Sequence, residues 1–227
     1  MSICILKHIE KKYRNGEEIE PLIDIDLEVD RGEFIIIKGP SGTGKSTLLY
    51  VIGTLLQADS GELYIDGQNV SDLSDTEKTE LRASKIGFMF QDSNLIQALT
   101  LRENLDFTVM IGNKIDKEHR KGAARANDFL DKLGLLDRAN YLPHQLSGGQ
   151  RRRAMIARAL INSPEIILAD EPTNDLDNKW SSEVMSILHE ECSRGAAVIM
   201  VTHNDGLTGE ADKVYRLSDG RLEKVSI

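Results

Sequence analysis

The stretch that most constrains this chain is a glycine-rich segment between a run of apolar residues and a run of helix-forming ones. The apolar run, Phe34 to Lys38, has the length and composition of a buried strand, and Lys45 to Leu56 is expected to form a helix. The pattern GxxxxGK[ST] is satisfied by Gly39, Pro40, Ser41, Gly42, Thr43, Gly44, Lys45, Ser46 and Thr47. A strand, a glycine-rich loop and a helix in this order predict a phosphate-binding loop.

The residue types of this loop suit a triphosphate with its magnesium ion. Glycines let the backbone curl around phosphate oxygens, and the helix that follows adds the positive end of its dipole. Lys45 is expected to reach the β and γ phosphates, and Ser46 to ligate Mg²⁺. The competing interpretation is a glycine-rich turn without a ligand, which the flanking strand and helix disfavour.

Short apolar segments alternate with helical ones along most of the chain. The expected strands of the core are 34–38, 86–90, 166–169 and 197–201. The expected helices are 45–56, 76–84, 117–133, 150–161 and 178–194, the second starting at a Ser74–Glu77 capping box. This alternation predicts an α/β fold, the core of a P-loop NTPase, with a mainly parallel sheet.

Two parts of the chain depart from that alternation. Near the N-terminus, segments 3–7, 23–29 and 61–67 read as strands separated by turns, which predicts an antiparallel β subdomain. No strand is expected from about 92 to 161, so this part is predicted to be an inserted helical subdomain. Residues 1–91 and 162–227 then form the core together with the antiparallel β subdomain.

A second candidate site follows the apolar residues Ile166 to Ala169. Asp170 and Glu171 come at the carboxyl end of that expected strand, which is where sheets of this class place ligands. Asp170 is suited to hold Mg²⁺ through its water shell, and Glu171 to accept a proton from an attacking water. An acidic pair after a strand is often only part of a solvated loop. Because this chain also has a phosphate-binding loop, the functional interpretation is favoured.

A third candidate site lies at the start of another expected helix. It consists of Ser147, Gly148, Gly149 and Gln150 after Leu146, a sequence that forms an anion site at a helix N-terminus. One nucleotide cannot use this loop and the phosphate-binding loop of the same chain if they lie on separate lobes. We therefore expect a two-fold dimer in which each triphosphate contacts both copies.

Composition and charge limit the partners. The chain has 227 residues and a net charge of −9, which opposes binding to nucleic acid or to an anionic membrane surface. No stretch approaches the ~18 apolar residues of a membrane span, and the first residues lack a signal-peptide pattern. The protein is therefore expected in the cytosol, with membrane contact through a protein partner. Cys4 and Cys192 lack zinc-site or disulfide spacing and are expected to be buried or half-buried thiols.

The arginines at 151, 152 and 153 suggest nucleic acid at first sight. Successive helical residues point about 100° apart, so these three make no single basic face. We expect a solvated helix with one interfacial arginine, Arg153.

The motifs GPSGTGKST, LSGGQ, IILADE and VTH, in that order, resemble the ABC ATPase family over essentially the whole chain. The resemblance implies a single ABC ATPase domain over residues 1–227. By it, Gln91 senses Mg²⁺ and the partner permease, His203 contacts the γ phosphate, and Tyr13 stacks on adenine. Residues 174–177 correspond to the loop that crosses the dimer interface. The competing interpretations are that His203 is a satisfied core or surface group and that Tyr13 only closes its strand.

The function implied is that of the ATPase subunit of an ABC transporter, with ATP and Mg²⁺ as cofactors. Two copies bind ATP between them, with Glu171 as the base and Lys45, Ser46 and His203 steadying phosphate charge. A separate membrane permease is driven from the cytoplasmic face of the inner (plasma) membrane, where this chain is peripheral. Docking is expected near 91–101, where Leu95, Ile96 and Leu99 offer apolar contacts or else belong to the core.

Several segments resemble the branch with lipoprotein-releasing, macrolide-export and antimicrobial-peptide ATPases. They are 16–18, 61–63 with 66–67, 90–95 and 171–173. This branch implies export or membrane extraction of a lipoprotein, peptide or drug. The chain departs from it at Asn174, where glycine is usual, at Asn204, where aspartate is usual, and at Arg151 and Arg152, where glutamines are usual. These departures leave the interface geometry and the turnover rate open.

The alternative is an ATPase of a transmembrane signalling or mechanotransmission complex that acts on an extracytoplasmic partner and moves no solute. The sequence does not separate the two, because the difference lies in the partner. A DNA-repair or chromosome-organising ABC protein is disfavoured, since no coiled-coil insertion or zinc-binding cysteine set is present and the charge is acidic.

Overall fold

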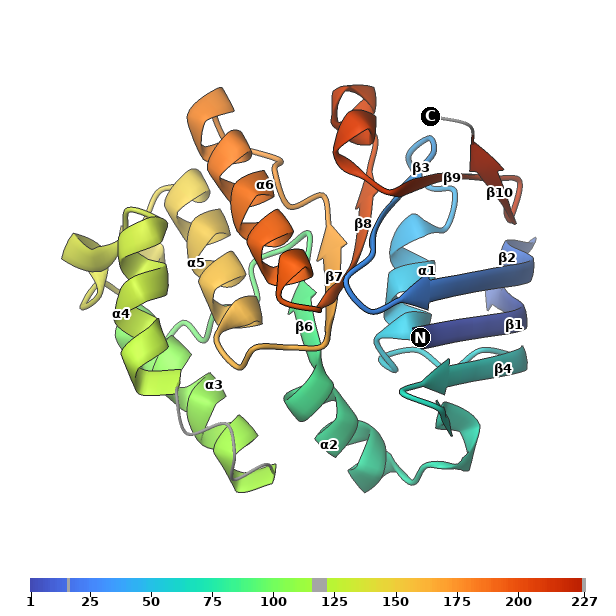
Figure 1. Ribbon diagram of the computed structural model, residues 1–227, viewed down its shortest axis with the longest axis horizontal. Coiled ribbons are helices and arrows are strands. Elements are labelled where there is room, and N and C mark those ends of the chain that lie inside the picture. Colours follow the sequence, from blue (N-terminus) through green and yellow to red (C-terminus); the bar gives the residue numbers. More distant parts are fainter. Residues whose placement is uncertain (16, 116–121, 226–227) are drawn as a thin grey trace.

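A mostly parallel sheet runs through the centre of the computed structural model, which describes residues 1–15, 17–115 and 122–225 (Figure 1). In this part of the chain the sheet has the strand order β10-β9-β3-β8-β7-β6. The bounds are β3 Phe34–Lys38, β6 Ile86–Met89, β7 Ile166–Asp170, β8 Ala197–Thr202, β9 Lys213–Ser218 and β10 Arg221–Val225. All neighbours pair in parallel except β9 with β10. The predicted mainly parallel sheet and its four predicted strands are confirmed, each boundary to within one residue.

The hairpin of β9 and β10 lies outside the predicted strands. Its turn contains Asp219 and Gly220, with φ angles of 49° and 74°. An Asp-Gly pair between two segments of strand-forming residues is a strong sequence signal for a hairpin, because both turn positions need positive φ. That signal was present in the sequence.

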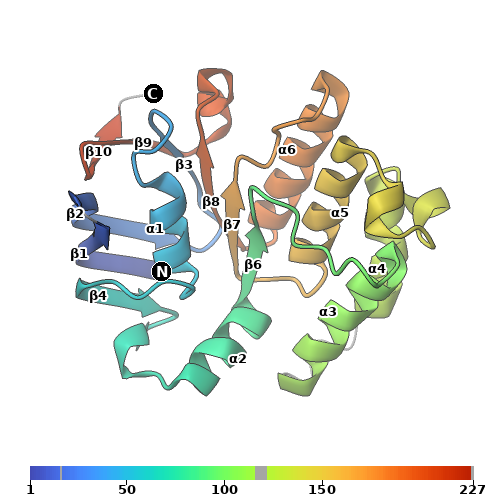
Figure 2. The ribbon, with the colours of Figure 1, turned by 180° about the vertical axis from the view of Figure 1, so that it is seen from behind.

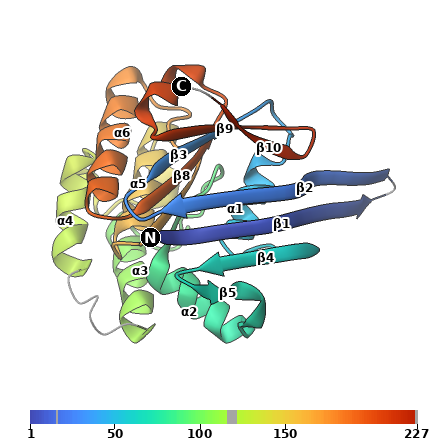
Figure 3. The same ribbon diagram turned by 45° about the vertical axis from the view of Figure 1, so that its right-hand side comes forward.

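A second sheet packs beside the first, and its strands are antiparallel (Figure 3). Its order is β2-β1-β4-β5, with bounds β1 Ser2–Asn15, β2 Glu17–Asp30, β4 Ser60–Ile65 and β5 Gln68–Asn69. The predicted antiparallel β subdomain is confirmed, but β1 and β2 are longer than predicted. His8 and Asp24, with φ of 51° and 55°, lie at register shifts between the two strands. Such bulges move the apolar alternation from one face to the other, which hides strand length in the sequence.

Helices cover both faces of the central sheet (Figures 1 and 2). They are α1 Lys45–Ile52, α2 Asp75–Lys85, α3 Leu101–Ile115, α4 Gly122–Lys132, α5 Gly148–Leu160 and α6 Asn178–Ser193. α1 lies between the two sheets, while α5 and α6 pack on the opposite face of the central sheet. None of the described helices is long and apolar enough to cross a membrane.

The helix starts agree with local capping. The Ser74–Glu77 capping box predicted for α2 is present. α3 lies outside the predicted helices, although Thr100 and Glu103 exchange the same pair of hydrogen bonds at its start. The predicted helix 117–133 corresponds to α4, but its residues 117–121 lie outside the described residues, as does Gly16. The division of the chain at about 92 and 161 stays a prediction.

Alternating side chains of the central strands divide the core into two clusters. In β3, Phe34 and Ile36 face the cluster with α5 and α6, and Ile35 and Ile37 face the cluster with α1. β3 is apolar on both faces because helices cover both, as expected for a parallel sheet. Cys4 and Cys192 are buried thiols, as predicted.

Candidate functional site

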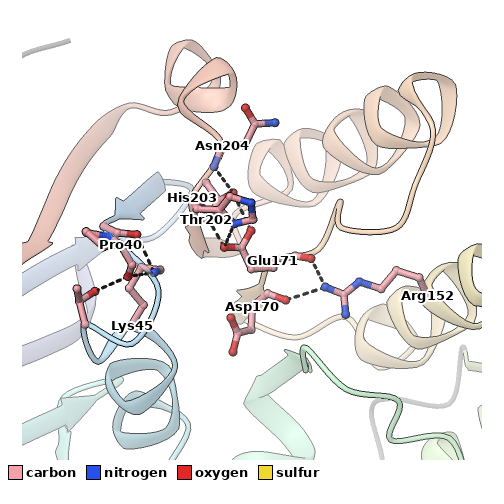
Figure 4. A network of polar contacts seen from close by, with 10 residues as sticks. Pro40, Lys45, Arg152, Asp170, Glu171, Thr202, His203 and Asn204 are labelled. Carbon is pink, nitrogen blue, oxygen red and sulfur yellow. Dashed lines mark hydrogen bonds and ion pairs between the residues drawn. The ribbon is translucent and has the colours of Figure 1, made fainter.

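The strand order brings the carboxyl ends of β3, β7 and β8 side by side. The glycine-rich loop follows β3, the acidic pair lies at the end of β7, and His203 follows β8. Parallel strands present their carboxyl ends at one edge of the sheet, so segments far apart in sequence meet there. Figure 4 shows these groups facing a common space.

The loop after β3 is tightly built and requires glycine at two positions. A Cβ on Gly39 would lie 2.3 Å from the carbonyl oxygen of Leu217, and one on Gly44 would lie 2.5 Å from that of Pro21. Gly44 also has φ of 98° and caps the start of α1. The loop therefore keeps a fixed shape that places the first amides of α1 at the site.

The Lys45 side chain is buried and curls back into this loop. Its ammonium donates hydrogen bonds to the carbonyl oxygens of Gly39 and Pro40, both at 2.8 Å (Figure 4). Burial lowers the pKa of Lys45, and the nearby carboxylates of Glu171 and Asp170 oppose that shift. A charged group held at the loop centre is placed to meet a phosphate.

Asp170 is only 2% exposed at the end of β7. Burial raises its pKa, while a hydrogen bond from the Ser46 hydroxyl acts in the opposite direction. Its Oδ2 atom is buried without a hydrogen-bond partner among the described residues. A buried, unpaired carboxylate oxygen beside a hydroxyl is a donor set that suits Mg²⁺, which binds proteins through few oxygen ligands.

Glu171, 7% exposed, is held at both carboxylate oxygens, by the last residue of β8 and by the residue that follows it. Its Oε2 accepts a hydrogen bond from the Thr202 hydroxyl at 2.9 Å. Its Oε1 accepts one from the main-chain N–H of His203 at 2.9 Å and lies 2.7 Å from His203 Nδ1. Its φ of 49° is unusual for a residue other than glycine. The acidic group and the histidine predicted to act together are thus in direct contact. Thr202, which sequence reasoning missed, holds the other carboxylate oxygen of Glu171.

A cavity of about 360 Å³ joins these groups. Its lining residues are Tyr13, Ile19, Pro21, Ser41, Gly42, Gly44, Lys45, Ser46, Thr47, Gln91, Asp170, Glu171, Asn174 and His203. The structure therefore brings together the predicted loop, the acidic pair, Gln91, His203 and Tyr13. Ile19 and Pro21 are additions to the predicted set, and Asn174, predicted as part of the loop at the dimer interface, also lines the cavity. Ile19 is an exposed apolar residue that pairs with Tyr13 across β1 and β2.

The predicted residues Ser147 to Gln150 do not line this cavity. They form the start of α5, where the Ser147 hydroxyl accepts a hydrogen bond from the Gln150 N–H and the Gln150 side chain accepts one from the Ser147 N–H. A Cβ on Gly148 would meet nothing within 4 Å. The helix start is thus open toward its surroundings, away from the phosphate-binding loop of the same chain.

The expectation of a solvated helix after this loop, with Arg153 as its one interfacial arginine, is wrong. Arg152 and Arg153 are both buried in this chain. The Arg153 guanidinium stacks 3.6 Å above the Trp180 ring, and Arg153 also donates to the carbonyl oxygen of Leu133. Arg152 points into the acidic segment after β7 (Figure 4). Main-chain carbonyl oxygens accept all the hydrogen bonds of Arg152, whereas Arg153 has one such acceptor and the Trp180 ring, and its Nε is buried without a partner among the described residues. A sequence pattern does not display main-chain acceptors.

A second cavity of about 370 Å³ lies between two groups of elements, with α1, α2 and β6 on one side and α3 and α5 on the other. Its lining is Gly53, Leu55, Thr79, Arg82, Ala83, Ser84, Ile86, Gly87, Phe88, Phe90, Asn94, Thr108, Ile111, Arg158, Ala159, Asn162 and Pro164. Of the apolar residues named for docking, Leu95 belongs to the core and Ile96 and Leu99 are half-buried. The second cavity instead reaches the predicted docking segment, residues 91–101, through Asn94, and Phe90 lines it just before that segment.

A phosphate-binding loop, an adjacent acidic pair and a histidine on a mainly parallel sheet define an NTPase of the P-loop class. A model of the ABC transporter family matches residues 22–174. The chain belongs to this family: it is the ATP-binding subunit of an ABC transporter and an ABC ATPase.

Similar proteins match this sequence over nearly the whole chain. An uncharacterised ABC transporter ATP-binding protein of Methanocaldococcus jannaschii is 44% identical over 220 residues, covering 96% of this chain and 97% of that protein. The macrolide export ATP-binding/permease protein MacB of Photorhabdus laumondii is 42% identical, covering 96% of this chain and 33% of its own length. A dimeric post-hydrolysis ABC cassette bound to ADP and Pi matches with a TM-score of 0.89 at 40% identity, over 99% of both chains.

Proposed function

We propose that this chain hydrolyses MgATP between two copies of itself and drives a membrane permease that exports or extracts a lipoprotein, peptide or drug. The observation that carries the proposal is the direct contact of Glu171 with His203 opposite the Lys45 loop, in one cavity. In this arrangement Glu171 accepts a proton from the attacking water. Lys45 and His203 steady the charge of the γ phosphate.

Mg²⁺ is proposed to bind beside the phosphates, held by Ser46, Asp170 and Gln91. Asp170 offers the buried oxygen without a partner, and Ser46 is its hydrogen-bonded neighbour. The ion neutralises charge on the phosphates. Tyr13, 38% exposed at the cavity margin, is proposed to stack on adenine.

The dimer is proposed from the position of the Ser147–Gln150 loop. Its free helix start lies outside the cavity of its own chain, so it is available to the triphosphate of a second copy. The similar solved cassettes are dimeric by their descriptions, one of them with ADP and Pi bound. Two equivalent sites then follow from two-fold symmetry.

The membrane partner is proposed to dock in the second cavity, called the docking groove from here on. Apolar side chains such as Phe88 and Ile111 line it, with the cations of Arg82 and Arg158 among them. In MacB an ATP-binding part and a permease are named in one protein, which supports export through a membrane subunit for this chain as well. The chain is then peripheral, at the cytoplasmic face of the inner (plasma) membrane.

The hydrolytic part is tested with Glu171→Gln, which keeps the hydrogen-bonding shape and removes the base. We expect the hydrolysis rate to fall about 100-fold or more, in line with loss of a general base. With ATP and Mg²⁺ the variant should accumulate as a dimer in light scattering after gel filtration. Glu183→Gln, at an exposed position on α6, is the control and should keep the parental rate. Parental hydrolysis by Glu171→Gln would show that the base is misassigned.

The partner is tested by affinity purification from membranes with identification of the integral protein retained. Ile111→Glu places a charge in the groove and should reduce that retention while ATP hydrolysis by the isolated chain persists. Met110→Glu, on the neighbouring exposed residue that does not line the groove, is the matched control. Equal retention of the partner by both variants would place docking elsewhere.

A further inference from the structure

Arg152 is a buried cation, 6% exposed, on the first turns of α5. A guanidinium has five N–H donors in a planar fork. All five N–H groups donate to main-chain carbonyl oxygens. Nε donates to Pro172 at 3.3 Å, and Nη1 donates to Phe90 and to Gln91, both at 2.7 Å. Nη2 donates to Asp170 at 2.9 Å and also to Glu171.

These acceptors belong to two segments that are far from Arg152 in sequence. One directly follows β6; its Phe90 lines the proposed docking groove and its Gln91 lines the nucleotide cavity. The other is the end of β7, which carries the acidic pair. Figure 4 shows the side chain reaching from its helix to the carbonyl groups of Asp170 and Glu171. One side chain therefore fastens the helix that starts with the Ser147 loop to both segments.

Arginine is the only side chain that can make all these bonds. Glutamine, usual at this position in the branch that the chain resembles, has two N–H donors, and lysine has three. Burial lowers the pKa of Arg152, and the carboxylates of Asp170, Asp175 and Glu171 oppose that shift. An arginine side chain stays charged in proteins. Arg152 therefore places a fixed positive charge next to the acidic pair and holds the main chain there with five hydrogen bonds.

We infer that Arg152 is a positioning residue for ATP hydrolysis, which holds the main chain of Phe90–Gln91 and of Asp170–Pro172 in fixed register with α5. A movement of residues 90–91, beside the proposed docking groove, is thereby passed to residues 170–172 and to the start of α5 as one unit. This inference rests on the proposed roles of Gln91 and Glu171. It adds that their alignment depends on Arg152, which does not itself line the nucleotide cavity.

The test compares Arg152→Gln and Arg152→Lys with the parental chain. Glutamine is usual in the branch, so the first variant is expected to fold. We expect kcat to fall about tenfold or more in Arg152→Gln, since a small misplacement of reacting groups is costly. KM for ATP should stay within about twofold, because the contacts of the phosphate-binding loop persist. Arg152→Lys should restore part of the loss, and amide hydrogen exchange should rise at 91–94 and 171–176 in both variants.

Arg216→Gln, which removes the same charge from an exposed position on β9, is the control and should keep the parental kcat. A lower melting temperature with unchanged kcat would make Arg152 merely structural and overturn the inference. So would a raised KM with unchanged kcat. The proposed function is judged separately: if Glu171→Gln is inactive and both Arg152 variants keep full kcat, only this inference fails. If Glu171→Gln keeps the parental rate, the assignment of the base fails first.

Discussion

Replacing Thr202 by valine tests how the carboxylate of Glu171 is held. Thr202 is fully buried at the end of β8, and its hydroxyl donates to Glu171 Oε2 at 2.9 Å. The same hydroxyl accepts a hydrogen bond from the Asn204 N–H at 3.1 Å; Asn204 is exposed, so water can replace this bond at little cost. Valine has nearly the shape of threonine, so the change removes these bonds without opening a cavity.

The magnitude follows from the lost charge-assisted bond, worth about 1.5 to 3 kcal/mol. Burying a methyl group in place of the hydroxyl returns about 0.8 kcal/mol. The free energy of unfolding should therefore fall by about 1 to 2 kcal/mol. For a chain of this size that corresponds to a drop of about 2 to 8 °C in Tm.

The assay is urea unfolding of the parental chain and Thr202→Val, read as a shift of midpoint at constant m value. Thr208→Val, which removes a threonine hydroxyl bonded to the Asp205 carbonyl, is the control and should change stability by less than about 0.5 kcal/mol. A double-mutant cycle with Glu171→Gln should give a coupling of about 1 kcal/mol, the excess of a charged over a neutral acceptor. A Thr202→Val protein as stable as the parent, or a coupling near zero, would refute this account of how Glu171 is held.

Three further outcomes are expected. Tyr13→Ala should weaken ATP binding about tenfold or more through lost stacking, measured by equilibrium titration; a change under about twofold would remove Tyr13 from the adenine site. Gly134→Ala should lower the unfolding free energy by about 2 kcal/mol or more, because φ is +61° and the new Cβ would lie 2.5 Å from Trp180 Cη2; parental stability in urea would contradict this. The hydrogen bond to Asp24 raises the pKa of His8 above 6.5, so its stabilising effect is complete below that pH and lost as pH rises through the folded value. An NMR titration should show this, and Asp24→Asn should bring the pKa back toward 6.5; an ordinary pKa in the parental chain would exclude the contact in solution.

The parts of the fold and site that the sequence predicted are those whose signals are local. The loop from Gly39 to Thr47 is contiguous. Close backbone approaches require glycine at Gly39 and Gly44, and Gly42 has a positive φ of 82°. Apolar runs of strand length gave β3, β7 and β8, because strands covered on both faces show few polar residues. The Ser74–Glu77 cap could be identified for the same reason, since both partners lie within one helical turn.

Other local signals were present in the sequence outside the predicted elements. The Thr100–Glu103 box marks α3, and Asp219–Gly220 marks the β9–β10 turn. Bulges hid the full length of β1 and β2, because each register shift, such as the one at His8, changes which side chains face the core. Sequence periodicity assumes an unbroken register, and these strands do not keep one.

The amino-acid sequence by itself determined the order of motifs, the α/β class and the chemistry each motif carries. Only the tertiary structure decided that Thr202 holds Glu171, that Leu95 belongs to the core, and that Arg152 is buried on five carbonyl groups. The physical reason is that main-chain carbonyl groups are the same in every residue, so a sequence does not show which of them will meet. Their positions are fixed only when the strand order β3-β8-β7-β6 and the packing of α5 bring segments some sixty residues apart together.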